Sequence, residues 1–262
     1  MWLLGSQACT PKTHTAHGYL SDKYLPSAAA PSSITQKVGN ESVLESNGTL
    51  RRQLVTSPSG KAYWIRWQKT TESRGSCNSG RLIDGLRLPK QGIGYRHIGD
   101  SGFGTDETVA YLRFAAWAVT EQYPNTVPVV IGDLSDDGGG HLRPHRSHQS
   151  GRDADVGLYR TKNRKLRWFK TLPKEETDFD KTWAFIEALL RTGAVQYIFL
   201  DRSLQESLYA HGLSRGFEKN ELDQIFEFPS RSKRAVIRHV RGHKNHLHVR
   251  FICPTDDDDC RK

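Results

Sequence analysis

The chain has 262 residues, of which 36% are hydrophobic, so it can bury one good core, and a second independent domain would have to be small. No stretch approaches the roughly twenty apolar residues that a membrane-spanning helix requires, so the sequence predicts no transmembrane segment. A formal net charge of +9 favours an anionic partner, but the basic residues are spread along the chain without a concentrated tail, which argues against nucleic-acid binding.

The first sixty residues differ in composition from the rest. Residues 1–9 are apolar and end in small residues, as a truncated secretory signal would, although they are short and lack a basic start. From about Thr10 to Leu54 the chain is rich in small and polar residues, which cannot bury enough surface to offset the entropy cost of ordering. We therefore expect a low-complexity, mostly disordered segment over 1–60 and one folded domain over 61–262.

The first expected elements of this domain are a helix and a strand. Thr105 is a candidate N-cap of an amphipathic helix that ends before Pro124. Val127–Ile131 is predicted to form a strand that leads into the glycine-rich loop at 138–140. The first group of histidines follows this loop.

Further helices and strands follow in an irregular order. Apolar periodicity predicts helices over 180–193, 203–210 and 219–226, the first and second ending at glycines. Strands are expected over 195–200, 235–240 and 246–251. Because no regular βαβ rhythm is present, the sequence favours an α+β fold with a central antiparallel sheet flanked by helices.

Polar and apolar residues alternate in two of these segments. In His246–Phe251 both histidines and the arginine share one face of a strand, while the apolar residues point into the core. In Asp153–Gly157 both aspartates share a face in the same way. If the two segments lie side by side in an antiparallel sheet, Asp155 and His248 come together.

The histidines are clustered. Seven of the eleven lie in two windows, His141–His148 and His239–His248, and histidine clusters near aspartates are a metal-binding signature, whereas a single histidine more often packs or forms a hydrogen bond. Zinc takes imidazole nitrogens and carboxylate oxygens, and a catalytic site supplies three protein ligands so that a fourth position can hold a water. His148, Asp155 and His248 fit this description and are predicted as ligands of Zn2+.

Four cysteines allow three disulfide pairings. Cys253 and Cys260 are separated by six residues, a short loop that a disulfide can close, and such a disulfide implies an oxidising compartment. Pairing of Cys9 with Cys77 and lipidation of Cys9 both stay open.

The motifs around these residues resemble those of a known family. Ser147 to Asp155 reads Ser-His-Gln-Ser-Gly-Arg-Asp-Ala-Asp, and it is preceded by Gly-Asp-Leu-Ser from Gly132 and followed by His-Leu-His-Val-Arg from His246. This pattern is similar to that of the penicillin-insensitive murein endopeptidases, which belong with the lysostaphin-type and D-alanyl-D-alanine metallopeptidases and the hedgehog fold. The similarity runs, with gaps, from about Cys77 to Cys260.

This resemblance implies a zinc-dependent endopeptidase of the periplasm or cell envelope that hydrolyses D-alanyl-diaminopimelyl amide cross-links in bacterial peptidoglycan. It assigns the metal ligands to His148, Asp155 and His248. It places additional active-site histidines at His145, His243 and His246. It also implies the pairing of Cys253 with Cys260.

Catalytic roles are expected for two of these histidines. His246 lies on the same strand face as His248, two residues away, and is the best candidate for a general base. His243 is expected to protonate the leaving amine or to hold the oxyanion. The alternative for His246 is simple packing beside the metal.

Supporting roles are expected for three further residues. His145 would line the cleft or contact the substrate, and Asp153 and Asp133 would accept the second N–H of ligating histidines. For Arg250, a contact with a substrate carboxylate and a structural salt bridge are equally compatible with the sequence.

Two alternatives to the endopeptidase remain at this point. A D,D-carboxypeptidase or dipeptidase of the same fold keeps the zinc and changes the bond that is cut. A non-catalytic, zinc-containing cell-wall-binding protein would usually have lost the additional histidines, which this chain retains.

Overall fold

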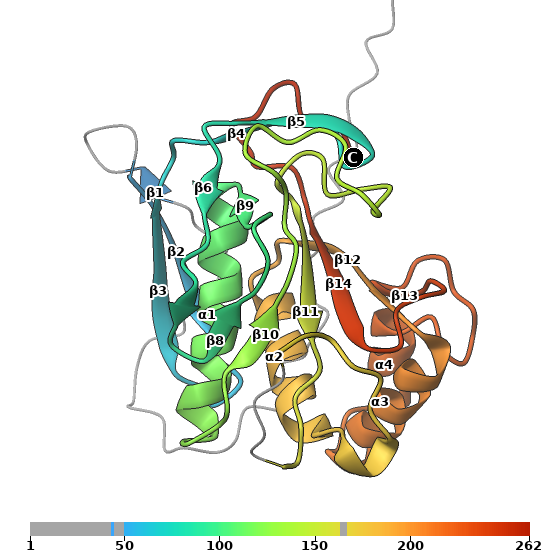
Figure 1. The fold of residues 1–262 in the computed structure, drawn as a ribbon. Coiled ribbons are helices and arrows are strands. Elements are labelled where there is room, and N and C mark those ends of the chain that lie inside the picture. The colour runs from blue at the N-terminus through green and yellow to red at the C-terminus, as the bar shows by residue number, and fades with distance from the viewer. Residues whose placement is uncertain (1–42, 45–49, 163–166) are drawn as a thin grey trace, which may run out of the picture.

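The computed structural model describes residues 43–44, 50–162 and 167–262. The expected truncated signal at 1–9, Cys9, and the low-complexity segment up to residue 42 lie outside the described residues. The chain is shown in Figure 1.

The described residues form fourteen strands, four α-helices and one short 3-10 helix, Lys174–Glu176. The strands are β1 (Val43–Leu44), β2 (Leu50–Thr56), β3 (Ala62–Gln68), β4 (Glu72–Ser76), β5 (Ser79–Ile83), β6 (Leu86–Arg87), β7 (Gln91–Gly92), β8 (Tyr95–His97), β9 (Phe103–Gly104), β10 (Val129–Ile131), β11 (Asp153–Gly157), β12 (Val195–Leu200), β13 (Ile237–His239) and β14 (His246–Phe251). The helices are α1 (Asp106–Gln122), α2 (Phe179–Arg191), α3 (Arg202–Ser214) and α4 (Lys219–Ile225). The α+β class predicted from the sequence is confirmed.

A seven-stranded sheet forms the centre of the molecule, in the order β13-β12-β14-β11-β10-β8-β7 (Figure 1). β14 lies between β12 and β11 and is antiparallel to both. The pairs β12–β13 and β10–β8 are parallel, so the sheet is mixed, where the sequence analysis predicted an antiparallel one. The reason lies in the connections: α3 and α4 carry the chain from β12 to β13, α1 carries it from β8 to β10, and such helical crossovers join parallel strands.

Helix α1 lies between the hairpin β2–β3 and the central sheet (Figure 1). It begins after Thr105, whose side chain accepts a hydrogen bond from the backbone N–H of Thr108, and it ends at Gln122, as predicted. Residues on most sides of this helix are buried, because it contacts β3 on one side and α2 and β8 on others.

The hairpin β2–β3 begins before Lys61, where the sequence analysis placed the start of the folded domain. β2 pairs with β3 along its full length. Its buried residues include Gln53, whose amide donates to the carbonyl of Thr192 and accepts from the hydroxyl of Tyr111. A buried glutamine satisfied by distant partners leaves no apolar signal in the sequence, so this strand was not predicted.

Helix α3 continues to Ser214, past Gly212, where the sequence analysis ended it. Gly212 instead serves packing, because a Cβ at this position would lie 2.8 Å from Cδ2 of Leu222 in α4. A glycine inside a helix thus allows close approach of a neighbouring side chain, which the local sequence does not distinguish from a helix stop.

Cys253 and Cys260 form a disulfide, as predicted, and Cys77 is buried and forms no disulfide with a described residue. The loop that the disulfide closes is fixed to the domain through Asp257, which accepts a hydrogen bond from the backbone of Ser73. Among the described residues, no helix has the length and apolar character that crossing a membrane requires.

Candidate active site

Strands β11 and β14 present the predicted aspartates and histidines on one face of the sheet. Their antiparallel register pairs Asp155 with His248 and Asp153 with Arg250. Ala154 and its partner Val249, which lie between these two pairs and point to the opposite face of the sheet, are fully buried. The period-two interpretation and the juxtaposition of Asp155 with His248 are therefore confirmed by the strand register.

His148 comes from the loop between β10 and β11 and is fully buried, with a left-handed backbone (φ 64°). Its backbone N–H lies 3.1 Å from Oδ2 of Asp153, and its carbonyl accepts from the Ser135 hydroxyl at 2.8 Å. Its ring Nδ1 donates to the carbonyl of Leu134 at 2.6 Å. This leaves Nε2 with its lone pair directed into the site, 3.4 Å from Oδ1 of Asp155.

His248 of β14 contacts both aspartates of β11. Its Nε2 lies 2.8 Å from Oδ1 of Asp153, and its Nδ1 lies 3.4 Å from Oδ1 of Asp155. Asp153 also accepts from Nε of Arg250 at 2.7 Å. Arg250 therefore forms a structural salt bridge with Asp153, which was one of the two roles considered for it.

Two atoms of the site are buried polar atoms without a hydrogen-bond partner among the described residues. They are Nε2 of His148 and Oδ1 of Asp155. Leaving such an atom unpaired costs on the order of 1–3 kcal/mol, so this point of the structure is suited to a cation. Imidazole nitrogen together with carboxylate oxygen is the donor set that zinc prefers, and the residues present fit a zinc ion.

His145 lies on the other side of the same carboxylate. Three residues, His145, His148 and Asp155, each place one donor atom within 4.8 Å of the others, so this group contains two of the three predicted ligands. Nδ1 of His145 is 3.8 Å from Oδ2 of Asp155, and its Nε2 is 3.1 Å from Oδ2 of Asp133. Asp133 thus contacts His145, while Asp153 contacts His248.

The two predicted catalytic histidines are also at this site. Nε2 of His246 lies 3.6 Å from Oδ1 of Asp155, and Nδ1 lies 2.7 Å from the side-chain oxygen of Asn245. The ring of His243 is 4.9 Å from that of His246 and 5.6 Å from that of His248. The structure therefore brings together every predicted site histidine.

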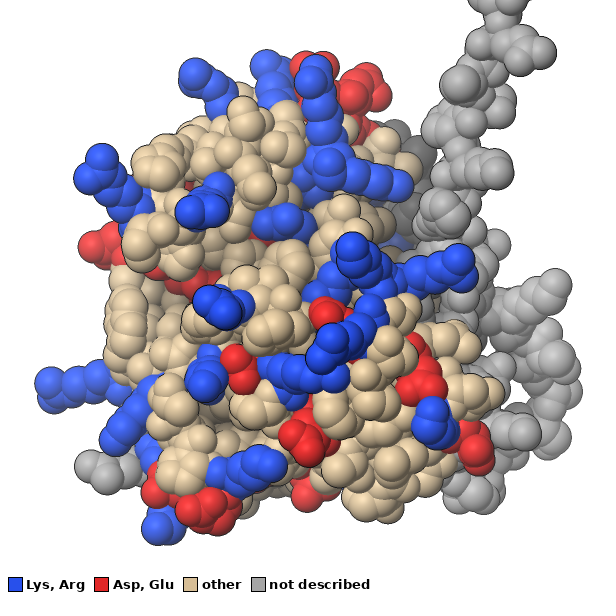
Figure 2. Space-filling model, turned by 90° about the vertical axis from the view of Figure 1, so that its right-hand side faces the viewer, with Lys and Arg blue, Asp and Glu red and all other residues tan. Residues whose placement is uncertain are grey.

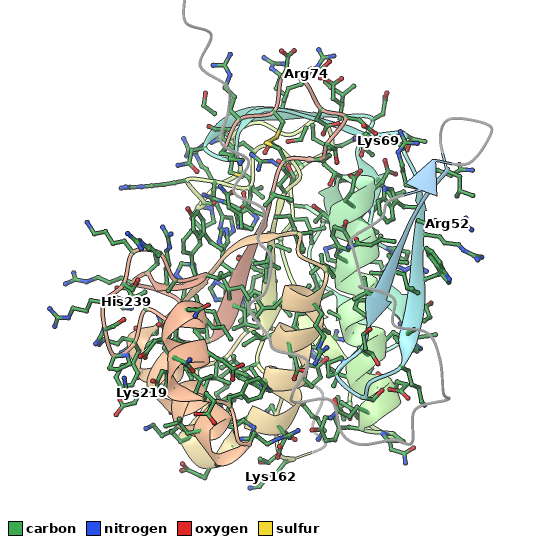
Figure 3. All side chains as sticks on the ribbon, turned by 180° about the vertical axis from the view of Figure 1, so that it is seen from behind. Arg52, Lys69, Arg74, Lys162, Lys219 and His239 are labelled. Atoms are coloured by element: carbon green, nitrogen blue, oxygen red, sulfur yellow. A yellow bond between two sulfur atoms is a disulfide. The ribbon has the colours of Figure 1, made fainter. Side chains whose placement is uncertain are left out.

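Other histidines of the two windows stay outside this cluster. His141 is exposed, and exposed His239 accepts a hydrogen bond from the backbone N–H of Arg202 through Nδ1. In Figure 3, His239 lies on the side of the molecule opposite to Lys69 and the hairpin β2–β3. Position in a histidine-rich window therefore does not by itself place a side chain in the site.

The charges around Asp155 favour its anionic form, and burial favours the neutral form of two neighbouring histidines. Burial opposes ionisation of Asp155, but the adjacent His148 ring, together with the charges of His248 and His246, holds the pKa of Asp155 well below the usual range. Burial lowers the pKa of His248 and lowers that of His246 to about 4. For His148, burial also opposes protonation, but Asp155 and Asp153 together raise its pKa. Near neutral pH, an anionic Asp155 thus faces neutral His246 and His248, and metal binding requires such a state.

Two aromatic side chains complete the site and were not predicted from the sequence. Phe199 of β12 is registered against His248, with the two rings 5.3 Å apart. Phe169 stacks on His246 with ring centroids 5.1 Å apart and planes 16° apart. A Cβ at Gly132 would lie 2.6 Å from Cζ of Phe169, so this ring occupies the space that the glycine leaves free.

The sequence contained a signal for Phe199 but not for Phe169. Val195–Leu200 was predicted as a buried strand, yet Tyr197 and Phe199 are half-buried and share the face that carries the site. Alternation along this strand was the available signal for Phe199. Phe169 follows a basic segment without periodicity, and its position depends on glycines elsewhere in the chain.

The excess of basic residues in the sequence is visible on one face of the molecule. Figure 2 shows one side of the molecule, on which Lys and Arg side chains are spread over much of the face and Asp and Glu form fewer groups. This agrees with the distribution of charge read from the sequence.

Comparison with known proteins identifies relatives of this chain. Residues 73–196 match the family model of penicillin-insensitive murein endopeptidase. A penicillin-insensitive murein endopeptidase of Pectobacterium atrosepticum is 24% identical over 241 residues, covering 82% of this chain and 80% of the relative. Those of Salmonella arizonae and Citrobacter koseri are 28% and 27% identical over 222 residues, covering 74% of this chain and 73% of each relative. The resemblance inferred from the motifs is confirmed.

Proposed function

We propose that this chain is a member of the penicillin-insensitive murein endopeptidase family, and that it is a zinc-dependent endopeptidase that hydrolyses D-alanyl-diaminopimelyl amide cross-links in peptidoglycan. The observation that carries the proposal is the position of Asp155. Its Oδ1 is buried without a hydrogen-bond partner among the described residues, and it lies 3.4 Å both from Nε2 of His148 and from Nδ1 of His248.

We assign the metal ligands to His148, Asp155 and His248. His148 and His248 approach the same carboxylate oxygen, and each has its other ring nitrogen engaged, by a backbone carbonyl and by Asp153 respectively. His145 approaches the other oxygen at a longer distance and has its Nε2 on Asp133, so we assign it to substrate binding. When bound, zinc polarises the scissile carbonyl and lowers the pKa of a water at the site towards about 7.

The histidines around these ligands supply the proton transfers. Nδ1 of His246 donates to Asn245, so Nε2 carries the lone pair and accepts the proton of the attacking water. His243, whose ring is 4.9 Å away, then delivers a proton to the amine that leaves. His246 lies on the face of β14 that carries His248, and the ring of His243 lies 5.6 Å from that of His248, so both side chains are close to Asp155 and its neighbours.

The proposed substrate and location follow from the family and from the disulfide. The relatives are named for hydrolysis of murein, and the basic surface suits a polymer that carries carboxylates. The disulfide between Cys253 and Cys260 supports an oxidising compartment, and we place the protein in the periplasm or cell envelope.

The experiment that tests this proposal is digestion of cross-linked murein sacculi by protein of measured zinc content, with the fragments read by mass spectrometry. Wild-type protein should convert cross-linked dimers to monomers, and a chelator should abolish the reaction. His246→Ala should retain zinc and lose activity, while His141→Ala, which changes an exposed histidine outside the cluster, should behave as wild type.

Each other outcome contradicts the proposal in a recognisable way. Release of terminal D-alanine without loss of cross-links would identify a D,D-carboxypeptidase. Binding of one zinc per chain with no amide cleaved would identify a zinc-containing cell-wall-binding protein. Full activity in the presence of chelator would exclude the metal mechanism.

A further inference from the structure

A groove separate from the candidate active site runs between β3 and α1. Its cavity volume is about 550 Å3, and it is lined by β3, by one stripe of α1 and by Ile93 in the turn between β7 and β8. None of the predicted ligands or catalytic histidines lines it. A cavity of this size is within the range of small-ligand and peptide sites.

Exposed large hydrophobic side chains gather at this groove, beside polar and basic ones. Eight large hydrophobic side chains are exposed in the described part of the chain, and four of them line this groove: Tyr63, Trp64, Leu86 and Ile93. Ile93 is the extreme case, with 66% of its surface exposed. A gathering of exposed apolar side chains at one place indicates an interaction surface.

One wall of the groove is the free edge of a β-sheet. β3 is the last strand of the sheet β1-β2-β3 and, among the described strands, pairs with β2 alone, and Figure 1 shows it as the outermost strand beside α1. Outside that pairing, no backbone hydrogen bond is present for Ala62–Gln68 among the described residues. Because strand residues alternate, every second residue of β3 therefore directs its N–H and C=O away from β2.

The groove also carries positive charge that the described residues do not neutralise. Arg66 on β3 and Arg113 on α1 are exposed, line the groove and make no ion pair with a described residue. The one carboxylate among the lining residues, Asp106, is buried and accepts hydrogen bonds from Thr70 and Thr71. A ligand that carries acidic groups would therefore complement the charge of Arg66 and Arg113.

We propose that this groove binds an extended acidic peptide, which adds as a further strand to the free edge of β3. Backbone pairing with an edge strand beside a helix is an established way for a domain to hold a peptide. Alternate side chains of the peptide would then face α1, where Tyr63 and Ile93 form an apolar surface, and the others would lie beside Arg66. A peptide with alternating apolar and acidic residues matches both faces.

An extended peptide is favoured over a sugar polymer by the open strand edge. Rings of Tyr63 and Trp64 alone would suit either ligand, but the alternating N–H and C=O groups of a strand edge match the repeat of an extended peptide backbone. This inference does not depend on the proposed peptidase activity, since the groove shares no residue with the assigned metal ligands and catalytic histidines.

The test uses the full chain and a fluorescein-labelled peptide of alternating valine and glutamate, about eight residues long to match a strand of this length. We expect saturable binding by fluorescence anisotropy. Methylation of every second peptide nitrogen, on the edge that pairs, should weaken binding at least about tenfold. The double variant Arg66→Glu/Arg113→Glu should weaken it to a similar extent and should instead bind the valine-lysine peptide.

A matched control separates specific recognition from net charge. Lys233→Glu/Arg234→Glu reverses two exposed basic residues far along the chain and changes the net charge by the same amount, so it should bind the valine-glutamate peptide as the wild type does. Thermal unfolding of both double variants establishes that they are folded. Hydrolysis of murein fragments should also be unchanged in both.

Three results would overturn the proposal. The first is no saturable binding of the valine-glutamate peptide up to about 1 mM, and the second is equal binding of the methylated and unmethylated forms. The third is a concentration-dependent dimer that disappears in Arg66→Glu/Arg113→Glu, which would show that a second copy of the chain uses the edge. Binding of chitohexaose in place of the peptide would assign the groove to sugars and contradict the proposal equally.

Discussion

Asp155 and His248 face each other across the β11–β14 pair, and Nδ1 of His248 lies 3.4 Å from Oδ1 of Asp155. Directly beside them, the same Oδ1 is 3.4 Å from Nε2 of His148. One carboxylate oxygen thus lies close to two histidines, His148 and His248, that are 100 residues apart in the sequence.

Either His248 or His145 could supply the third metal ligand beside His148 and Asp155, and alanine variants distinguish the two assignments. We expect His248→Ala to lose zinc, because it removes a nitrogen that faces the unpaired Oδ1 of Asp155. His145→Ala should keep zinc at one per chain and lose activity through weaker substrate binding. Zinc content by plasma emission after gel filtration is the measurement. If His145→Ala loses the metal and His248→Ala retains it, the ligand assignment is wrong.

Asp153 supports the metal site through its contact with Nε2 of His248 at 2.8 Å. Asp153→Asn removes the negative charge that orients this ring, and such support is worth about 10- to 100-fold in metal affinity. Competition with a chromophoric chelator measures the loss. Asp137→Asn, which changes an exposed aspartate, should leave the affinity unchanged. An unchanged affinity in Asp153→Asn, with the variant folded, would mean that the contact does not support the ligand.

Phe169 positions His246 by stacking on its ring at 5.1 Å. Phe169→Leu should lower kcat roughly tenfold with KM and zinc content unchanged, because a misplaced base affects the chemical step and not binding. Gly132→Ala should have the same effect, since its Cβ would lie 2.6 Å from the ring carbon Cζ. Trp168→Leu is the control, since that neighbouring ring is 57% exposed. A rise in KM alone would instead make Phe169 a substrate contact.

His97 makes the stability of the protein sensitive to acid. It is 3% exposed, neither ring nitrogen has a hydrogen-bond partner among the described residues, and burial, aided by Lys90 and Arg87, lowers its pKa to about 4. In the unfolded chain its pKa is about 6.5, so between these values the unfolded state binds the proton more strongly and the free energy of unfolding falls as pH falls.

The comparison of wild type with His97→Leu isolates this effect from the metal site. Urea unfolding at several pH values should show that wild type loses up to about 3 kcal/mol more than the variant between pH 7 and pH 4. His141→Leu, at an exposed position, should retain the pH dependence of the wild type. Parallel curves for wild type and His97→Leu would show that His97 titrates normally in the folded protein.

Cys77 should be unreactive in the folded protein. It is 4% exposed, and burial, together with the charge of Asp153, raises the pKa of its thiol to about 11. Only the thiolate reacts with iodoacetamide, so labelling at pH 8 should be at least about 100-fold slower in buffer than in urea. Mass spectrometry of the peptide that contains Cys77 separates this thiol from the others. Equal labelling rates in the two conditions would show that Cys77 is accessible.

The sequence by itself determined the local geometry of the site. Alternation with period two placed both histidines of His246–Phe251 on one face and both aspartates of Asp153–Gly157 on another, because successive side chains of a strand point to opposite sides. Capping by Thr105 and the short loop between Cys253 and Cys260 are equally local, and the structure contains both. The family motif added which of these residues to consider together.

Only the tertiary structure decided which helices, strands and side chains pack against one another. The mixed sheet, the strand β2 with its buried Gln53, the extension of α3 past Gly212 and the stacking of Phe169 on His246 all depend on partners distant in sequence. The physical reason is that backbone periodicity is set by neighbouring residues, whereas strand order and the space that a glycine leaves are set by packing across the whole core. The sequence determined which side chains share a face, and the fold decided which faces meet.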